Sequence, residues 1–192
     1  NLSVDGGTIK LDGNYPTGTG NVALGDDALR DGSLSGGNNT AIGHYALYAN
    51  TSGADNTSIG RGNLDANTTG SYNTALGSTA LSSSTTGSYN TALGSLALNS
   101  STTASNNTAV GYQAGYTTNT GSSNTSSGYQ SFYSNTTGHS NAATGYHALY
   151  SNSTASYNTA NGLQALYSNT TGQYNTAMGA TALYSNTTAS NN

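Results

Sequence analysis

Small and apolar residues recur along this chain at fixed positions separated by 17 residues. The repeat, aligned on the asparagine that opens most "NTA" segments, starts at Asn39, Asn56, Asn73, Asn90, Asn107, Asn124, Asn141, Asn158, Asn175 and Asn192. These starts define nine complete units without an insertion. So short and strict a period is typical of a solenoid, because one unit cannot bury its own apolar face and stacks on its neighbours.

Each unit divides into two segments, "NTAIG" and "YALYAN" in the first complete unit. The units are rich in Gly, Asn, Ser and Thr, which form helices poorly, so we expect a short strand in each segment. Every unit has glycine at the position of Gly43, and Gly or Ala at the position of Gly53. Two such columns, meaning sets of equivalent residues in successive units, predict two corners per coil. The predicted fold is all-β, a parallel β-solenoid (β-roll) of 17-residue coils with two short strands per coil.

The alternation of side chains along a strand sorts these columns into an interior and an exterior. The columns of Ala41 and Leu47 stay small or apolar and are expected inside, and the Asn39 column shares the Ala41 face. Stacked asparagines can form a ladder of amide hydrogen bonds along the rod. The predicted core ladder consists of Asn39, Asn56, Asn73, Asn90, Leu47, Leu81, Leu98, Leu149, Leu166 and Leu183. At a spacing of ~4.8 Å, nine coils form a rod of roughly 40 Å.

Two columns are expected on the outer face of the first strand. The Thr40 column is threonine in eight of nine units, and the Ile42 column is aliphatic in its first half but continues through Ser127, Thr144 and Asn161. Such polar residues indicate an outer surface, and an exposed apolar stripe on that surface is typical of a subunit contact. The predicted subunit interface consists of Ile42, Ile59, Leu76, Leu93 and Val110.

Tyrosine is the abundant large residue, with 15 copies against one Phe and no Trp. One tyrosine column contains Tyr48, Tyr116, Tyr133, Tyr150, Tyr167 and Tyr184, and another contains Tyr72, Tyr89, Tyr157 and Tyr174. The first interpretation is stacking along the rod. The second is a sugar-binding or subunit-contact surface, since tyrosine combines a flat apolar ring with a hydroxyl. The candidate surface-binding residues are Tyr133, Tyr150, Tyr167 and Tyr184.

Charge is scarce and lies early in the chain. The formal net charge is -4, and no Lys, Arg, Asp or Glu follows Asp65. Without a basic patch we expect no nucleic-acid partner, and without a long apolar run we expect no membrane insertion. The chain has no cysteine, so neither disulfides nor thiolate metal sites can form.

Residues suited to catalysis are few. His139 and His147 have no acidic partner in the charge-free region, and the neighbouring Asp26 and Asp27 point to opposite faces of a strand. The sequence therefore predicts no enzyme, no cofactor and no metal site. Asn-x-Ser/Thr segments at Asn67 and Asn169 are interpreted mostly as turn chemistry repeated from unit to unit.

The predicted organisation has three parts. Residues 1–20 stand outside the repeat and are expected to form an N-terminal lead-in strand and cap. Residues 21–38 form an imperfect first coil, and residues 39–192 form a nine-coil solenoid. The final "NN" starts another unit, which predicts that the solenoid continues beyond this fragment.

The segments "NTAIG", "NTALG", "NTAVG" and "NTAMG", often followed by "xxAL", resemble the head repeats of trimeric autotransporter adhesins. Together with the "SNTTG" corners and the lead-in "GGTIKLDGNYPTGTGNVALG", the units are still more similar to bacteriophage tail-fibre repeats. The first resemblance implies a left-handed parallel β-roll that assembles as a homotrimer. The second implies an extracellular shaft on a virion tail.

Three functional hypotheses follow. The first is a structural fibre or shaft of an extracellular or virion appendage, such as a phage tail fibre that supports host attachment, with the chain itself as oligomeric partner. The second is a bacterial surface adhesin or extracellular filament whose tyrosine columns bind a host-surface glycan or receptor. The third is an ice-binding solenoid, because the Thr40 and Ile42 columns form a regular outward array.

Overall fold

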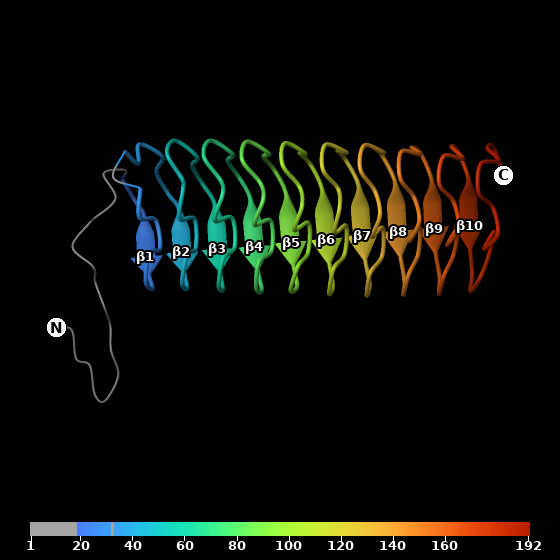
Figure 1. The fold of residues 1–192 in the computed structure, drawn as a ribbon, viewed down its shortest axis with the longest axis horizontal. Coiled ribbons are helices and arrows are strands. Elements are labelled where there is room, and N and C mark those ends of the chain that lie inside the picture. The colour runs from blue at the N-terminus through green and yellow to red at the C-terminus, as the bar shows by residue number, and fades with distance from the viewer. Residues whose placement is uncertain (1–18, 32) are drawn as a thin grey trace, which may run out of the picture.

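The chain folds into a parallel β-solenoid, seen here in a computed structural model that describes residues 19–31 and 33–192 (Figure 1). Ten three-residue strands form one sheet, and the described residues contain no helix. The strands are β1 (Val22–Leu24), β2 (Thr40–Ile42), β3 (Thr57–Ile59), β4 (Thr74–Leu76), β5 (Thr91–Leu93), β6 (Thr108–Val110), β7 (Thr125–Ser127), β8 (Ala142–Thr144), β9 (Thr159–Asn161) and β10 (Thr176–Met178). The predicted lead-in strand and cap, residues 1–20, lie outside the described residues except for the last two.

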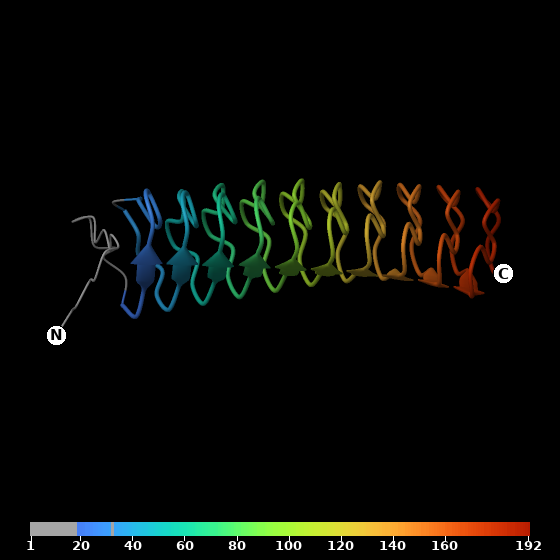
Figure 2. The ribbon, with the colours of Figure 1, turned by 90° about the horizontal axis from the view of Figure 1, so that it is seen from below.

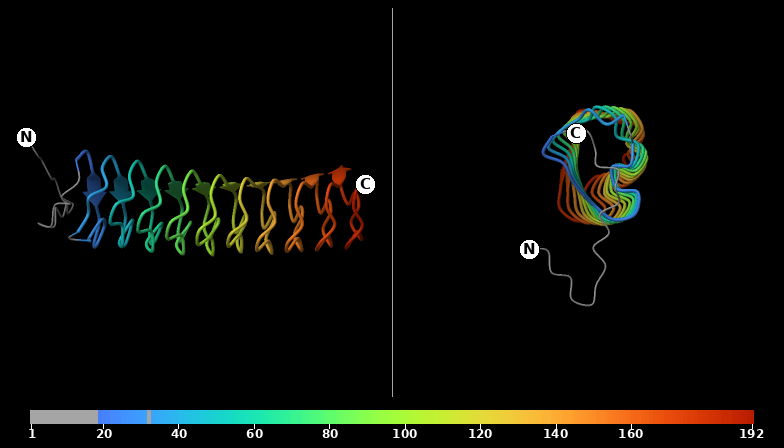
Figure 3. Two further views of the ribbon diagram at one scale, coloured as in Figure 1. Left: turned by 90° about the horizontal axis from the view of Figure 1, so that it is seen from above. Right: turned by 90° about the vertical axis from the view of Figure 1, so that its left-hand side faces the viewer.

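Successive strands pair in parallel and in the order of the sequence. From β2 to β10 each residue pairs with its equivalent 17 positions later, as Thr74 does with Thr91. Between β1 and β2 the offset is 18, since Val22 pairs with Thr40. Seen along the rod, the coils lie over one another and rotate gradually (Figure 3).

Each coil contains one strand, whereas two were expected. The segment that begins at His44 forms successive turns, and it lies on the side of the rod away from the strands (Figure 2). Tyr45 and Leu47 adopt left-handed backbone conformations, with φ of 59° and 52°. This alternation directs backbone groups to both neighbouring coils: Tyr45 N–H donates to the carbonyl of Asp26, and Leu47 N–H donates to that of Asn63. The turns therefore close the coil and still bond to the coils on either side.

The two corner columns differ in their backbone. Gly43 and its equivalents have φ between 113° and 145°, a region that side chains rarely enter. A methyl group on Gly43 would also lie 2.4 Å from the carbonyl oxygen of Gly60 in the next coil. Gly53 does not have a left-handed φ. Alanine in that second column, as at the buried Ala104, therefore meets no backbone strain, although a methyl group on Gly53 would lie 2.3 Å from the carbonyl oxygen of Gly70.

The apolar core is a narrow line of alanine and leucine side chains that falls into two clusters. The first runs from Leu29 to Ala114 and the second from Phe132 to Ala177. The buried columns of Ala41, Ala46 and Leu47 supply these side chains, and between the two clusters they carry Ser126, Ser131 and Gly115, respectively. Gly115 lies in the coil that starts at Asn107, and Ser126 and Ser131 lie in the next coil, so the break spans two neighbouring coils.

Candidate functional site

The Asn39 column forms a continuous interior ladder. Asn56 Nδ2 and Asn56 N–H both donate to Oδ1 of Asn39, at 3.1 and 3.0 Å. The same pattern joins Asn73 to Asn56 and Asn90 to Asn73. Each amide also crosses the coil, as Asn39 Nδ2 does to the carbonyl of Gly53 at 2.9 Å. The remaining core-ladder residues, Leu47, Leu81, Leu98, Leu149 and Leu166, are buried, while Leu183 in the last coil is 36% exposed.

A second buried polar column, that of Asn50, was not identified from the sequence. Asn67 Nδ2 donates to Asn50 Oδ1 at 2.8 Å and to the carbonyl of Gly70 at 3.0 Å. Asn169 makes the equivalent bonds to Asn152 and Gly172. Asn67 and Asn169 open the two glycosylation-like segments noted above, and both side chains are fully buried. Their amides therefore serve the interior and are inaccessible in the folded chain.

The outer face of the sheet carries the Thr40 and Ile42 columns. The middle residue of each strand from β2 to β10 is buried, and the two flanking side chains face outward. Leu76 is 47% exposed, and Ile59 and Val110 are also exposed. Ile42 and Leu93 are half-buried. The five predicted interface residues thus form one aliphatic stripe, which Leu24 on β1 extends.

Tyrosine rings stack into three ladders on the turn side and corner of the coils. In the first, Tyr116, Tyr133, Tyr150, Tyr167 and Tyr184 follow one another with ring centroids 5.1–5.2 Å apart and interplanar angles of 4–7°. Tyr112, Tyr129 and Tyr146 form a second ladder at 5.3 Å. At the corner, Tyr72 stacks on Tyr89 and Tyr157 on Tyr174. The sequence did not reveal the second ladder, because its column has His44, Arg61 and two serines in the first half.

A short polar row accompanies the first two ladders. Gln130 Nε2 donates to Gln113 Oε1 at 2.6 Å, and His147 Nε2 lies 2.8 Å from Gln130 Oε1. The His147 ring also lies 3.9 Å from the Tyr146 ring and 4.8 Å from that of Tyr150. Burial among these groups lowers the pKa of His147. The surface there is neutral, aromatic and rich in hydrogen-bonding groups.

Stacking determines what these tyrosines can offer a ligand. Within a ladder neighbouring rings cover each other's facing sides, as between Tyr133 and Tyr150. The ring edges and hydroxyls remain available. Burial and then the neighbouring phenols raise the pKa of Tyr133 and Tyr167, so these hydroxyls keep their protons at neutral pH. The candidate surface-binding residues Tyr133, Tyr150, Tyr167 and Tyr184 therefore present a row of hydroxyl groups rather than stacked ring faces.

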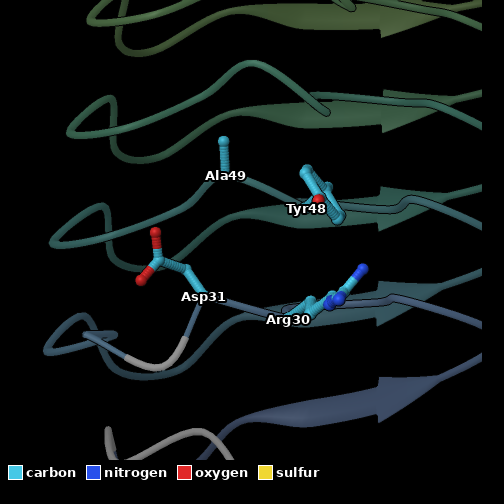
Figure 4. A pocket seen from close by; sticks show the side chains of 4 residues that line it. All are labelled: Arg30, Asp31, Tyr48 and Ala49. Carbon is cyan, nitrogen blue, oxygen red and sulfur yellow. The ribbon is translucent and has the colours of Figure 1, made fainter.

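A shallow depression of about 260 Å³ lies near the N-terminal end of the rod, between Arg30, Asp31, Tyr48 and Ala49 (Figure 4). The Arg30 guanidinium lies 5.8 Å from the centroid of the Tyr48 ring and 3.3 Å from the carboxylate of Asp27. Asp31 accepts hydrogen bonds from the hydroxyl and N–H of Ser33, which lower its pKa. The depression is smaller than the usual ligand pocket of about 300–1,000 Å³. We therefore place no binding site there.

The few catalytic-type side chains lie apart. His139 stacks edge-on against Tyr157, His147 belongs to the polar row, and His44 lies against Tyr45. No group of three His, Asp or Glu side chains within residues 19–31 and 33–192 is arranged to hold a metal ion. In the same part of the chain no helix is long and apolar enough to cross a membrane.

No protein family, curated protein or solved structure matches this chain.

Proposed function

We propose that this chain is a rigid structural segment of an extracellular or virion fibre, like the shaft of a phage tail fibre that supports host attachment. The observation that carries the proposal is the unbroken 17-residue register from β2 to β10. Hydrogen bonds between neighbouring strands run across the strands, which here means along the rod. Each pair of coils adds backbone and side-chain bonds of this kind, so an axial pull is shared by many bonds at once.

The proposed partner is the chain itself, as a homotrimer. The aliphatic stripe of Leu24, Ile42, Ile59, Leu76, Leu93 and Val110 supports this, because it follows the rod axis over six successive coils. Three rods packed along this stripe would remove it from water. An exposed apolar surface of this kind is typical of an association site.

The function is tested by locating the protein on intact particles or cells of its source. Antibodies against the repeat are expected to label thin fibres that project from a virion or a cell surface. Label confined to the interior of cells would contradict the proposal. The trimer is tested separately, because sedimentation should give three times the chain mass of 19.2 kDa.

A second candidate function is a glycan-binding adhesin or filament. The specific observation in its favour is the neutral surface formed by the Tyr116 ladder, the Tyr112 ladder and the Gln113–Gln130–His147 row. Because the ring faces are covered, recognition would use hydroxyls and amides. Replacing Tyr150, Tyr167 and Tyr184 together with Phe keeps the rings and removes the hydroxyls. Loss of glycan-array binding in this variant would support the adhesin, and no binding by the unmodified chain would exclude it.

A further inference from the structure

One interior column contains a run of polar groups that have no partner within the chain. The described residues have five buried side-chain oxygen atoms without a hydrogen bond, and four belong to consecutive members of the Asn50 column. These atoms are Asn67 Oδ1, Ser84 Oγ, Ser101 Oγ and Thr118 Oγ1. All four residues are fully buried. Buried polar groups without partners are costly and rare, so a run of four in one column needs an explanation.

The run begins where the asparagine ladder is interrupted. Asn67 Nδ2 donates to Asn50 Oδ1, but the next three coils carry Ser84, Ser101 and Thr118 in this column. The backbone is unchanged, since Asn50 N–H and Ser84 N–H each donate to the carbonyl three residues earlier, at 3.2 and 3.1 Å. The hydroxyl side chains are simply too short to repeat the amide contacts.

The shorter side chains also leave room at the second corner. A methyl group on Gly53 would lie 2.4 Å from Asn50 Oδ1, and one on Gly70 would lie 2.4 Å from Asn67 Oδ1. On Gly87 the corresponding distance, to Ser84 Oγ, is 3.2 Å. The Ser84 hydroxyl therefore lies farther from this corner than the amide oxygens of Asn50 and Asn67 do.

The corner carbonyls show the same difference. The Gly53 carbonyl accepts two amide hydrogen bonds, from Asn39 and from Asn50. The Gly70 carbonyl likewise accepts from Asn56 and Asn67. In the three coils after Gly70, the carbonyls of Gly87, Ala104 and Gly121 accept an amide bond from the Asn39 column alone. Each of these carbonyls therefore lacks the second amide donor and can accept one further hydrogen bond.

We propose that three ordered water molecules complete the ladder, one each beside Ser84, Ser101 and Thr118. The first water donates to the Gly87 carbonyl and to Asn67 Oδ1, and it accepts from the Ser84 hydroxyl. The second donates to the Ala104 carbonyl and to Ser84 Oγ, and accepts from Ser101. The third repeats this arrangement with Gly121, Ser101 and Thr118.

In this arrangement the water replaces the NH₂ of asparagine, and the hydroxyl oxygen replaces Oδ1. Three hydrogen bonds per molecule is the usual number for buried water. All four unpartnered atoms gain a partner, and the direction of donation matches the Asn67-to-Asn50 bond. This site is independent of the proposed fibre function.

A high-resolution crystal structure of the chain tests the proposal directly. We expect solvent density within hydrogen-bonding distance of each of the three hydroxyls, and none at the equivalent points beside Asn50, Asn152 and Asn169. Gaps without density, in a map that shows other ordered waters, would overturn the proposal. Density with five or more oxygen neighbours at cation distances would also overturn it.

A variant with Ser84→Asn, Ser101→Asn and Thr118→Asn provides the second test. The three amides should displace the waters, join the two parts of the Asn50 column and raise the thermal midpoint. Ser83→Asn, one residue outside the column, is the control and should leave the density in place. An unchanged or lower thermal midpoint of the triple variant would show that no space for a water molecule exists beside these three residues. If the variant does not fold, the crystal structure of the unmodified chain decides the question.

Discussion

The side-chain amide of Asn90 donates to Oδ1 of Asn73, which lies 3.1 Å away and one full coil earlier in the chain. The backbone N–H of Asn90 donates to the same oxygen at 3.0 Å. Asn73 Nδ2 in turn donates to Asn56 Oδ1 and to the carbonyl of Gly87. One buried side chain thus connects three successive coils.

Replacing Asn73 with alanine should therefore lower the free energy of unfolding sharply. The change leaves the Asn90 N–H without its acceptor and the Gly87 carbonyl without its amide donor. At roughly 1–3 kcal/mol for each buried unsatisfied group, we expect a loss of about 2–4 kcal/mol in denaturant unfolding. Asn161→Ala, at an exposed outward position on β9, is the control and should change little. An equal loss of unfolding free energy in the two variants would show that the ladder does not stabilise the fold more than an exposed asparagine does.

The Gly43 column predicts a second contrast. Gly94 has φ of 139°, and a methyl group there would lie 2.4 Å from the carbonyl oxygen of Gly111. Gly94→Ala should cost about 3 kcal/mol or more, because it adds backbone strain and forces two coils apart. Gly62→Ala is the matched control: its φ is 61°, and the nearest atom to a methyl group would be 3.4 Å away. We expect about 1–2 kcal/mol for Gly62→Ala, with both values read from thermal unfolding.

The proposed trimer predicts that one charge on the aliphatic stripe separates the subunits without unfolding them. Leu76 is 47% exposed in the single chain, so Leu76→Glu should leave the fold intact. In a trimer three carboxylates would meet in an apolar contact, which strongly disfavours assembly. Sedimentation velocity should show monomers for this variant. Thr144→Glu, in the polar half of the same column, should retain the oligomer, and the opposite pattern would place the interface elsewhere.

Acid should weaken the coils around His147. Burial lowers the pKa of His147 below its ordinary value of 6.5, so the unfolded chain takes up the proton first as the pH falls. The stabilisation is therefore complete above the ordinary pKa and is lost as the pH drops through it. We expect the thermal midpoint to fall between about pH 8 and about pH 5. His147→Gln matches the glutamines of this column and should remove that part of the pH dependence, whereas an identical profile would exclude His147 as its source.

The register of the solenoid is readable from the sequence because side chains in contact are copies of one another. Thr74 pairs with Thr91, and Asn73 contacts Asn90, so identity at a spacing of 17 residues is itself the contact pattern. The burial of Ala41 and Leu47 could be predicted in the same way, because their columns stay small or apolar in every unit. These relations need no knowledge of the backbone between the columns.

The path of the backbone within each coil is harder to predict from the sequence. The segment around Leu47 has a strand-like alternation of side chains, but it reaches this alternation through left-handed residues. The sequence contains one sign of these left-handed residues, because glycine occurs as Gly62 in the Tyr45 column and as Gly115 in the Leu47 column. The Asn50 column was missed because Asn, Ser and Thr are also common in turns, and the sequence alone does not show that its side chains point inward.

The 17-residue register also has a genetic consequence. Duplication or deletion of one unit, seventeen codons, returns each column to an equivalent neighbour and leaves the contacts between coils intact. Loss of a single codon within the array would instead leave one coil a residue short, so part of that coil would no longer lie opposite its equivalents in the neighbouring coils. Whole-coil steps are therefore the changes in length that keep every column stacked on its equivalents.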